Sequence, residues 1–182
     1  ESNLSPVHFN LNRDQRHLIV IGDSQTGKTS FLKNIIAEVC RGKKSRFAVF
    51  GIVDLRRSLL GFLTDDDPQL GGYAGMRAGV TPLVEGIKGI LDSRLPPDNV
   101  TVEQLKNRSW WSGPETYLVI DDFDMIEGSG NPLKPLVPYL PQSEDLGLHI
   151  IVARRSAGVS RSSYDPVMQG LREAGANGIL LS

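Results

Sequence analysis

Short runs of apolar, mostly branched residues recur along this chain and are separated by stretches with helical periodicity. The runs are rich in Ile, Val and Leu with little polar alternation, which is typical of strands buried on both faces of a sheet. Strands are expected over 17–22, 46–54, 117–122, 148–153 and 178–181, with an alternating edge strand over 7–11. Because strands that alternate with helices form βαβ units, the pattern predicts an α/β protein: a mostly parallel sheet with helices on both faces.

Helices are predicted where apolar residues recur at three- and four-residue spacing or where capping signals stand. They are expected from the residues after Gly27 to Arg41, over 56–63, from Thr81–Pro82, from the capping box at Thr101, and over 165–174, with a loop over 64–75. Prolines stand at every third position from Pro132 to Pro141. This spacing indicates either a short capped helix that the later prolines stop or, as the alternative, a polyproline II segment.

A glycine-rich segment between the first strand and the first helix fits the P-loop pattern of Gly, four residues, then Gly-Lys-Thr. Glycines let backbone N–H groups converge on phosphate oxygens, and the dipole of the following helix adds to that field. Lys28 is expected to reach the β- and γ-phosphates of ATP, and the Thr29 hydroxyl to bind Mg²⁺. The candidate nucleotide-binding residues are Gly22, Asp23, Ser24, Gln25, Thr26, Gly27, Lys28, Thr29 and Ser30.

Two acids at the end of the strand over 117–122 form the second half of the candidate site. In P-loop ATPases such acids hold Mg²⁺ and orient the attacking water, so Asp121 is the candidate metal ligand and Asp122 the candidate catalytic acid. Asp122 is one methylene shorter than the glutamate usually found there, so it is expected to hold a water less well. The strand over 46–54 lies between the two motifs, which is consistent with the additional-strand class of P-loop ATPases. The sequence has no Asn-Lys-x-Asp motif to recognise a guanine base, which counts against a GTPase.

Composition restricts the class of protein. The chain has 182 residues, 40% of them hydrophobic and 23% charged, which is typical of one soluble domain and excludes disorder. Its single cysteine excludes an internal disulfide, and its net charge of -1 gives no overall attraction to nucleic acid or anionic membranes. Neither an initiator Met nor a signal peptide is visible. The expectation is one domain over 1–182, cut from a longer protein.

Four segments carry a resemblance to a known family. They are the P-loop, residues 109–115 with two adjacent tryptophans, residues 117–124, and residues 146–156 with Ala-Arg-Arg-Ser at the strand end. Standing in this order, they resemble the C-terminal (third) ATPase domain of the EccC motors of type VII (ESX) secretion, which belong to the FtsK/SpoIIIE superfamily. The P-loop alone identifies only a superfamily, whereas the tryptophan pair and the Ala-Arg-Arg-Ser strand end are far more specific.

The resemblance implies a RecA-like domain, one of three in tandem on a membrane-anchored chain at the cytoplasmic face of the cell membrane. Such motors form hexamers and export WXG100-type helical-hairpin proteins, whose C-terminal signals dock on the last ATPase domain. Neighbouring ATPase domains and a secreted hairpin protein are therefore the expected partners, with membrane contact only through the rest of the motor and no nucleic acid. The alternative function is an FtsK-like DNA translocase, against which the near-neutral charge counts.

The strand over 148–153 departs from the pattern of the DNA-pumping relatives. Where those relatives have Thr-Gln-Arg-Pro, with Gln and Thr sensing the γ-phosphate, this chain has Ala153 to Ser156. Together with Asp122, the departure predicts slow hydrolysis. Arg154 is the second candidate catalytic residue, because it lies beside the expected γ-phosphate and could contact it in cis or from a neighbouring subunit; the alternative is a solvated charge.

Two further segments leave alternatives open. Trp110 and Trp111 either pack against the core or dock a partner, since Trp is enriched at binding hot spots. The apolar residues over 56–63 either pack in the core or dock a substrate helix in a groove.

Overall fold

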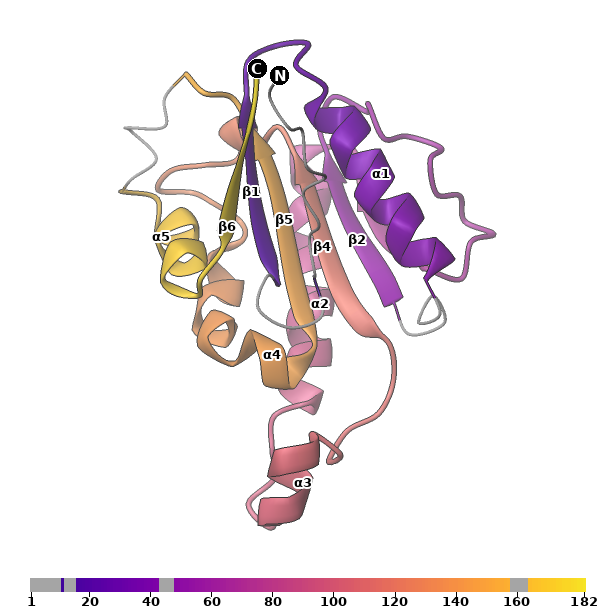
Figure 1. The fold of residues 1–182 in the computed structure, drawn as a ribbon, viewed down its shortest axis with the longest axis vertical. Helices are drawn as coiled ribbons and strands as arrows, with labels where there is room; N and C mark the ends of the chain where they lie inside the picture. Colours follow the sequence, from indigo (N-terminus) through magenta and orange to yellow (C-terminus); the bar gives the residue numbers. More distant parts are fainter. Residues whose placement is uncertain (1–10, 12–15, 43–47, 158–163) are drawn as a thin grey trace, which may run out of the picture.

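One parallel sheet organises the part of the chain that the computed structural model describes, residues 11, 16–42, 48–157 and 164–182 (Figure 1). Its strand order is β3-β2-β4-β5-β1-β6, and every neighbouring pair is parallel. The predicted α/β class is confirmed. The strands are β1 (His17–Gly22), β2 (Ala48–Asp54), β3 (Leu70–Ala74), β4 (Glu115–Asp121), β5 (Leu148–Arg154) and β6 (Asn177–Leu181).

Helices cover both faces of the sheet and form two hydrophobic cores. The elements are α1 (Lys28–Arg41), α2 (Arg77–Ser93), α3 (Val102–Asn107), α4 (Ser143–Leu146) and α5 (Pro166–Glu173), with the 3₁₀ helices η2 (Phe123–Met125) and η3 (Lys134–Gln142). On β4, Tyr117 and Val119 belong to the core beneath α1, whereas Leu118 and Ile120 belong to the core beneath α2, η3 and α5. This alternation explains why the strand is apolar at successive positions.

The edge strand β3 was not predicted, because Gly71 and Gly72 lie within a stretch that reads as a loop. A Cβ on Gly71 would lie 2.4 Å from Cγ1 of Val49, and one on Gly72 would lie 2.7 Å from Cδ1 of Leu83. The two glycines therefore let β3 approach β2 and α2 closely. The expected loop over 64–75 is wrong at its end, where Leu70–Ala74 is a strand.

The helix predicted over 56–63 is also wrong; the structure has turns there. The carboxylate of Asp54 accepts hydrogen bonds from the backbone N–H groups of Ser58 (3.0 Å) and Leu59 (2.6 Å), and so fixes a compact turn. Arg57 has a left-handed backbone (φ 60°), which interrupts a helix. Side-chain capping by Asp54 thus replaces the helix that apolar spacing indicates.

Two predicted helices need correction at their ends or in their type. α2 begins at Arg77 rather than at Thr81, and it contains Pro82 in its second turn, where the missing N–H removes one helical hydrogen bond. The proline-rich segment forms the 3₁₀ helix η3 instead of polyproline II. A 3₁₀ helix has three residues per turn, so the proline spacing places the prolines along one side while Leu133, Leu136 and Leu140 are buried.

Other predictions are confirmed. α1 ends at Arg41 before Gly42, and α5 begins after the N-cap Asp165. The capping box at the start of α3 is complete: Thr101 Oγ1 accepts from the N–H of Gln104, whose side-chain oxygen accepts from the N–H of Thr101. The edge strand expected over 7–11 lies, apart from Leu11, outside the described residues.

Candidate nucleotide-binding site

The P-loop joins the carboxyl end of β1 to the first turn of α1, at the top of the sheet in Figure 1. Gly27 caps α1 in the left-handed region (φ 90°), which favours glycine. A Cβ on Gly22 would lie 2.4 Å from Oγ1 of Thr26 and 2.9 Å from the carbonyl oxygen of Leu181. A side chain is therefore disfavoured at Gly27 by the backbone conformation and at Gly22 by lack of space. The strand–loop–helix arrangement expected for phosphate binding is present.

Lys28 extends back over this loop. Its Nζ donates to the carbonyl oxygens of Gly22 (3.0 Å) and Asp23 (2.6 Å), and the residue is buried despite its charge. Thr26 Oγ1 also donates to Asp23 O at 3.0 Å. The ammonium is thus held at the loop, where a phosphate chain would receive it, while Asp23, Ser24, Gln25 and Ser30 are exposed.

Thr29 and Asp121 meet although they lie on different elements. The Thr29 hydroxyl donates to Oδ2 of Asp121 at 2.6 Å, across from α1 to the end of β4. Burial raises the pKa of Asp121 above that of an ordinary aspartate, while the hydrogen bond from Thr29 opposes this and the charges of Asp122 and Asp54 add to it. A hydroxyl and a carboxylate side by side are the hard oxygen donors that Mg²⁺ prefers.

Asp122 follows β4 directly and has a left-handed backbone (φ 53°). Its Oδ2 lies 3.0 Å from Nε of Arg56, and its side chain is largely buried. Arg56 follows β2, the neighbouring strand, within the turns that replace the predicted helix. The sequence did not indicate this pair, since Arg56 was placed on a helix and nothing in the local pattern links it to Asp122.

Arg154 ends β5 with a fully buried side chain, so it is not a solvated charge. Its guanidinium lies 3.4 Å from a carboxylate oxygen of Asp124 and 3.3 Å from one of Glu127. Asp124 also accepts from the N–H of Arg155 at 3.0 Å. Burial raises the pKa of Glu127, and Arg154 opposes that rise. Arg154 therefore fixes η2, which begins directly after Asp122; its predicted phosphate contact stays a prediction.

A further link joins the end of β5 to the P-loop, since the Ser156 hydroxyl bonds to the carboxylate of Asp23. The carboxyl ends of β1, β4 and β5 thus bring together the predicted residues of the two motifs. Among the residues that the structure describes, no three His, Cys, Asp or Glu side chains cluster as a metal site of their own.

The tryptophan pair lies at the opposite end of the sheet and supports the packing interpretation. Trp110 Nε1 donates to Arg94 O and Trp111 Nε1 donates to Asp145 O, both at 2.7 Å. The Arg94 guanidinium lies 4.3 Å from the centroid of the Trp111 ring. Both indoles therefore have internal partners, which accounts for this specific sequence block without a docking role.

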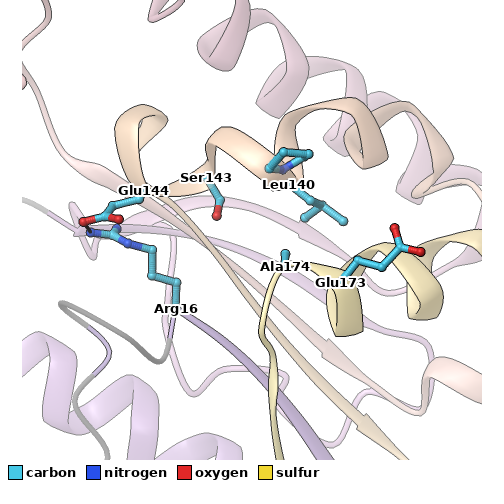
Figure 2. Close-up of a pocket in the computed structure, with 7 residues that line it drawn as sticks. Arg16, Leu140, Ser143, Glu144, Glu173 and Ala174 are labelled. Atoms are coloured by element: carbon cyan, nitrogen blue, oxygen red, sulfur yellow. Dashed lines mark ion pairs between the residues drawn. The ribbon is translucent and has the colours of Figure 1, made fainter. Parts of the chain in front are cut away.

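A cavity of about 390 Å³ also lies at this end, where β1, β5 and β6 begin (Figure 2). Figure 2 shows Arg16 against Glu144 on one side and Glu173 on the other. Ser143 on its wall bonds to Nε2 of buried His17 at 3.0 Å. The cavity is far from the P-loop along the strands, so it is separate from the candidate nucleotide site.

Two comparisons with curated proteins give similarity along nearly the whole chain. EccC of the ESX secretion system of Thermomonospora curvata is 41% identical over 182 residues, which are 100% of this chain and 14% of that protein. EccC4 of the ESX-4 system of Mycobacterium tuberculosis is 40% identical over 167 residues, which are 91% of this chain and 13% of that protein.

A solved structure agrees in fold and sequence. Thermomonospora curvata EccC (ATPases 2 and 3), in complex with a signal sequence peptide, superposes with a TM-score of 0.89 at 40% identity, covering 98% of this chain and 32% of that one. The chain is homologous to the ATPase domains of EccC. The six parallel strands and flanking helices are therefore the RecA-like P-loop fold of EccC.

The homology to EccC covers one domain of much longer proteins, because the chain spans only 13–14% of the length of these two relatives. Its P-loop ATPase relatives imply that this chain binds a nucleotide. No family model matches the sequence. Within the described ranges, no helix combines the length and apolar character needed to cross a membrane.

Proposed function

We propose that this chain is the third ATPase domain of an EccC-type secretion motor, and that it binds ATP with Mg²⁺ and hydrolyses it slowly. One observation carries the nucleotide assignment: Thr29 and Asp121, from two separate motifs, touch at 2.6 Å beside a P-loop that holds Lys28. A glycine turn followed by an ordinary helix would not need this contact. The homology to EccC supports the same assignment.

The residues present fit both groups. Lys28 and the backbone N–H groups over 22–30 would hold the phosphates, and Thr29 with Asp121 would hold the cation. When bound, Mg²⁺ supplies positive charge beside the phosphate oxygens. Asp122 would orient the attacking water and accept its proton, as carboxylates at this position do in related ATPases.

Slow hydrolysis follows from how the polar groups are engaged. Asp122 is paired with Arg56, and the buried Arg154 is paired with two acids of the η2 region. Neither group is free to act on a phosphate or a water without rearrangement. Steady phosphate release from the chain that is lost in Asp122→Ala would support turnover at this site.

We place substrate docking on the turns after β2, residues 55–63, hereafter the 55–63 segment. Leu59 is buried and anchors the segment, whereas Leu60 and Phe62 are 63% and 37% exposed. Lys33 of α1 lies 5.8 Å from the centroid of the Phe62 ring, and Figure 1 shows the connection after β2 running alongside α1. Exposed apolar side chains beside a helix suit the apolar face of a helical peptide.

The occupant we propose is the C-terminal signal of a WXG100-type helical-hairpin protein, in keeping with the signal sequence peptide bound by Thermomonospora curvata EccC. The chain would act beside other ATPase domains of the same motor, in a hexamer at the cytoplasmic face of the membrane, with membrane contact through the rest of the motor. No relative described above favours the DNA translocase alternative.

Calorimetry tests the nucleotide site. Lys28→Ala should weaken ATP binding about 10- to 100-fold, because it removes a charged donor to phosphate oxygens. Lys33→Ala is the matched control on the same helix, since Lys33 faces Phe62 rather than the P-loop, and it should leave ATP affinity unchanged. Equal ATP affinity in Lys28→Ala and the unaltered chain would remove the assignment.

Peptide binding tests the docking surface. A secreted hairpin protein should bind this chain only with its C-terminal tail, and Leu60→Asp should weaken binding about tenfold or more, as expected for a hot-spot contact. Val102→Asp is the control, because Val102 is 71% exposed on α3, which Figure 1 shows apart from the 55–63 segment. Equal losses in both variants, or binding without the tail, would contradict this placement.

A further inference from the structure

The ion pair between Arg56 and Asp122 connects the 55–63 segment to the candidate catalytic acid. The two residues follow neighbouring strands: Asp54, the last residue of β2, pairs in register with Asp121, the last residue of β4. Nε of Arg56 lies 3.0 Å from Oδ2 of Asp122. The pair therefore bridges two strand ends at the edge of the sheet where the P-loop lies.

Both partners stand on constrained backbone. The Asp54 carboxylate accepts from two N–H groups of the 55–63 segment, at Ser58 and Leu59, and from the Tyr73 hydroxyl at 2.9 Å. Asp122 has its left-handed backbone, and its N–H donates to Oδ1 of Asp121 at 3.0 Å. Hydrogen bonds thus fix the backbone on both sides of the pair, which keeps the guanidinium and the carboxylate close to each other.

We propose that Arg56 is a positioning residue that holds Asp122 in a resting arrangement, and that peptide docking on the 55–63 segment releases it. A guanidinium has only donors, so its contact with Oδ2 competes with a hydrogen bond that the attacking water would donate to this carboxylate. The inference rests on the proposed function, because it gives the docking surface a route to the ATP site. The route is short, because exposed Leu60 lies four positions after Arg56 in the chain.

The strength of the pair suits a releasable contact. The Arg56 side chain is 48% exposed and that of Asp122 is 12% exposed. Water around the guanidinium therefore weakens the electrostatic attraction between the two groups. Ion pairs of this kind shift an equilibrium only about 1.5- to 5-fold. Peptide binding can shift an equilibrium by more than this factor. Lys28 does not compete for Asp122, because its Nζ is already engaged with two P-loop carbonyl oxygens.

Steady-state kinetics of the whole 182-residue chain test the resting arrangement. Arg56→Gln should raise kcat about 2- to 5-fold with little change in KM for ATP, because the pair no longer holds Asp122. Arg56→Lys retains a cation and should stay near the unaltered rate, and Arg57→Gln is the neighbouring control. Adding Asp122→Asn to Arg56→Gln should abolish the gain.

A kcat that falls in Arg56→Gln would make Arg56 an aid to catalysis, and would overturn the proposal. So would an unchanged kcat, or no turnover in any variant, provided that calorimetry shows intact ATP binding. Loss of ATP binding in the unaltered chain would instead overturn the proposed function itself.

A nucleotide-free measurement tests the coupling. In ¹H–¹⁵N spectra, the Nε–H of Arg56 should exchange with solvent more slowly than that of Arg57, and Asp122→Asn should remove the difference. A synthetic C-terminal signal peptide should also speed this exchange. Binding of the peptide without any effect at Arg56 would overturn the coupling while leaving docking intact. Failure of the peptide to bind would defeat the docking placement, and the kinetics would still decide the role of Arg56.

Discussion

Asp165→Ala should lower the free energy of unfolding by about 3–4 kcal/mol, since a buried carboxylate with several donors is lost at once. Oδ1 of Asp165 caps α5 by accepting from the N–H groups of Val167 (2.8 Å) and Met168 (3.2 Å). Oδ2 accepts from the N–H of Gly128 (2.7 Å) and the Asn131 amide (3.0 Å). Removing the side chain leaves these donors, most of them buried, without an acceptor.

Urea denaturation measures this effect, and the chain supplies its own comparison. Thr101 is also an N-cap, but its capping box on α3 is exposed, so Thr101→Ala should cost only about 1 kcal/mol. Asp165→Asn should also be destabilising, because the NH₂ group of asparagine would replace one carboxylate oxygen and face N–H donors that need an acceptor. Equal costs at Asp165 and Thr101 would show that the buried network adds nothing to an ordinary cap.

Stability should fall as the pH is lowered below about 6.5, and His17 should contribute to the fall together with His149, because burial lowers the pKa of both histidines. Burial lowers the pKa of His17 from 6.5 to about 3, with the nearby charges of His149 and Arg16 adding to the effect. Nδ1 of His17 accepts from the N–H of Ile150 at 3.1 Å, so this nitrogen carries no proton. Protonation would replace that acceptor with a donor facing a donor.

The sign of the effect follows from the lowered pKa. Above pH 6.5 the imidazole is neutral in both states and contributes no pH dependence. Between about pH 6.5 and pH 3 the unfolded chain takes up a proton that the folded chain excludes. Each pH unit therefore costs about 1.4 kcal/mol, and about 4–5 kcal/mol is lost over the whole window.

His17→Asn isolates this contribution, because Asn retains an acceptor oxygen but does not titrate. Its unfolding free energy, measured in urea from pH 7.5 to pH 4.5, should vary less than that of the unaltered chain by about 2–3 kcal/mol. Asp121 and Glu127, whose pKa values are raised, act with the opposite sign in both proteins and so cancel in the difference. Parallel curves would assign the acid sensitivity to other groups.

Much of the fold could be predicted because its signals are local. Strands buried on both faces must be apolar at successive positions, so the four central strands β2, β4, β5 and β1 stand out in the sequence. The half-exposed edge strand β6 was found from its short apolar run. The cap at Asp165 and the box at Thr101 depend on residues within one helical turn. The edge strand β3 could not be predicted, because Gly71 and Gly72 serve close packing against Val49 and Leu83, which are distant in sequence.

The candidate site divides in the same way. The P-loop and Asp121 could be found from spacing, since each motif is a continuous segment ending a strand. The partners of the predicted catalytic residues could not be found, because they depend on which strands are neighbours. Arg56 reaches Asp122 only because β2 pairs with β4, and Arg154 meets Glu127 only because η2 folds beside β5.

The position of β1 in the sheet has a consequence for how the site is made. β1 pairs with β5 on one side and β6 on the other, and Gly22 lies against Leu181. During synthesis, β1 emerges from the ribosome before both of its partner strands, because these strands lie within residues 148–181 and are translated later. The P-loop is thus among the earliest described segments to be translated and among the last to find its final neighbours. A ribosome-bound nascent chain that ends before β5 lacks both strands that pair with β1, so its P-loop has no neighbouring strands to support it.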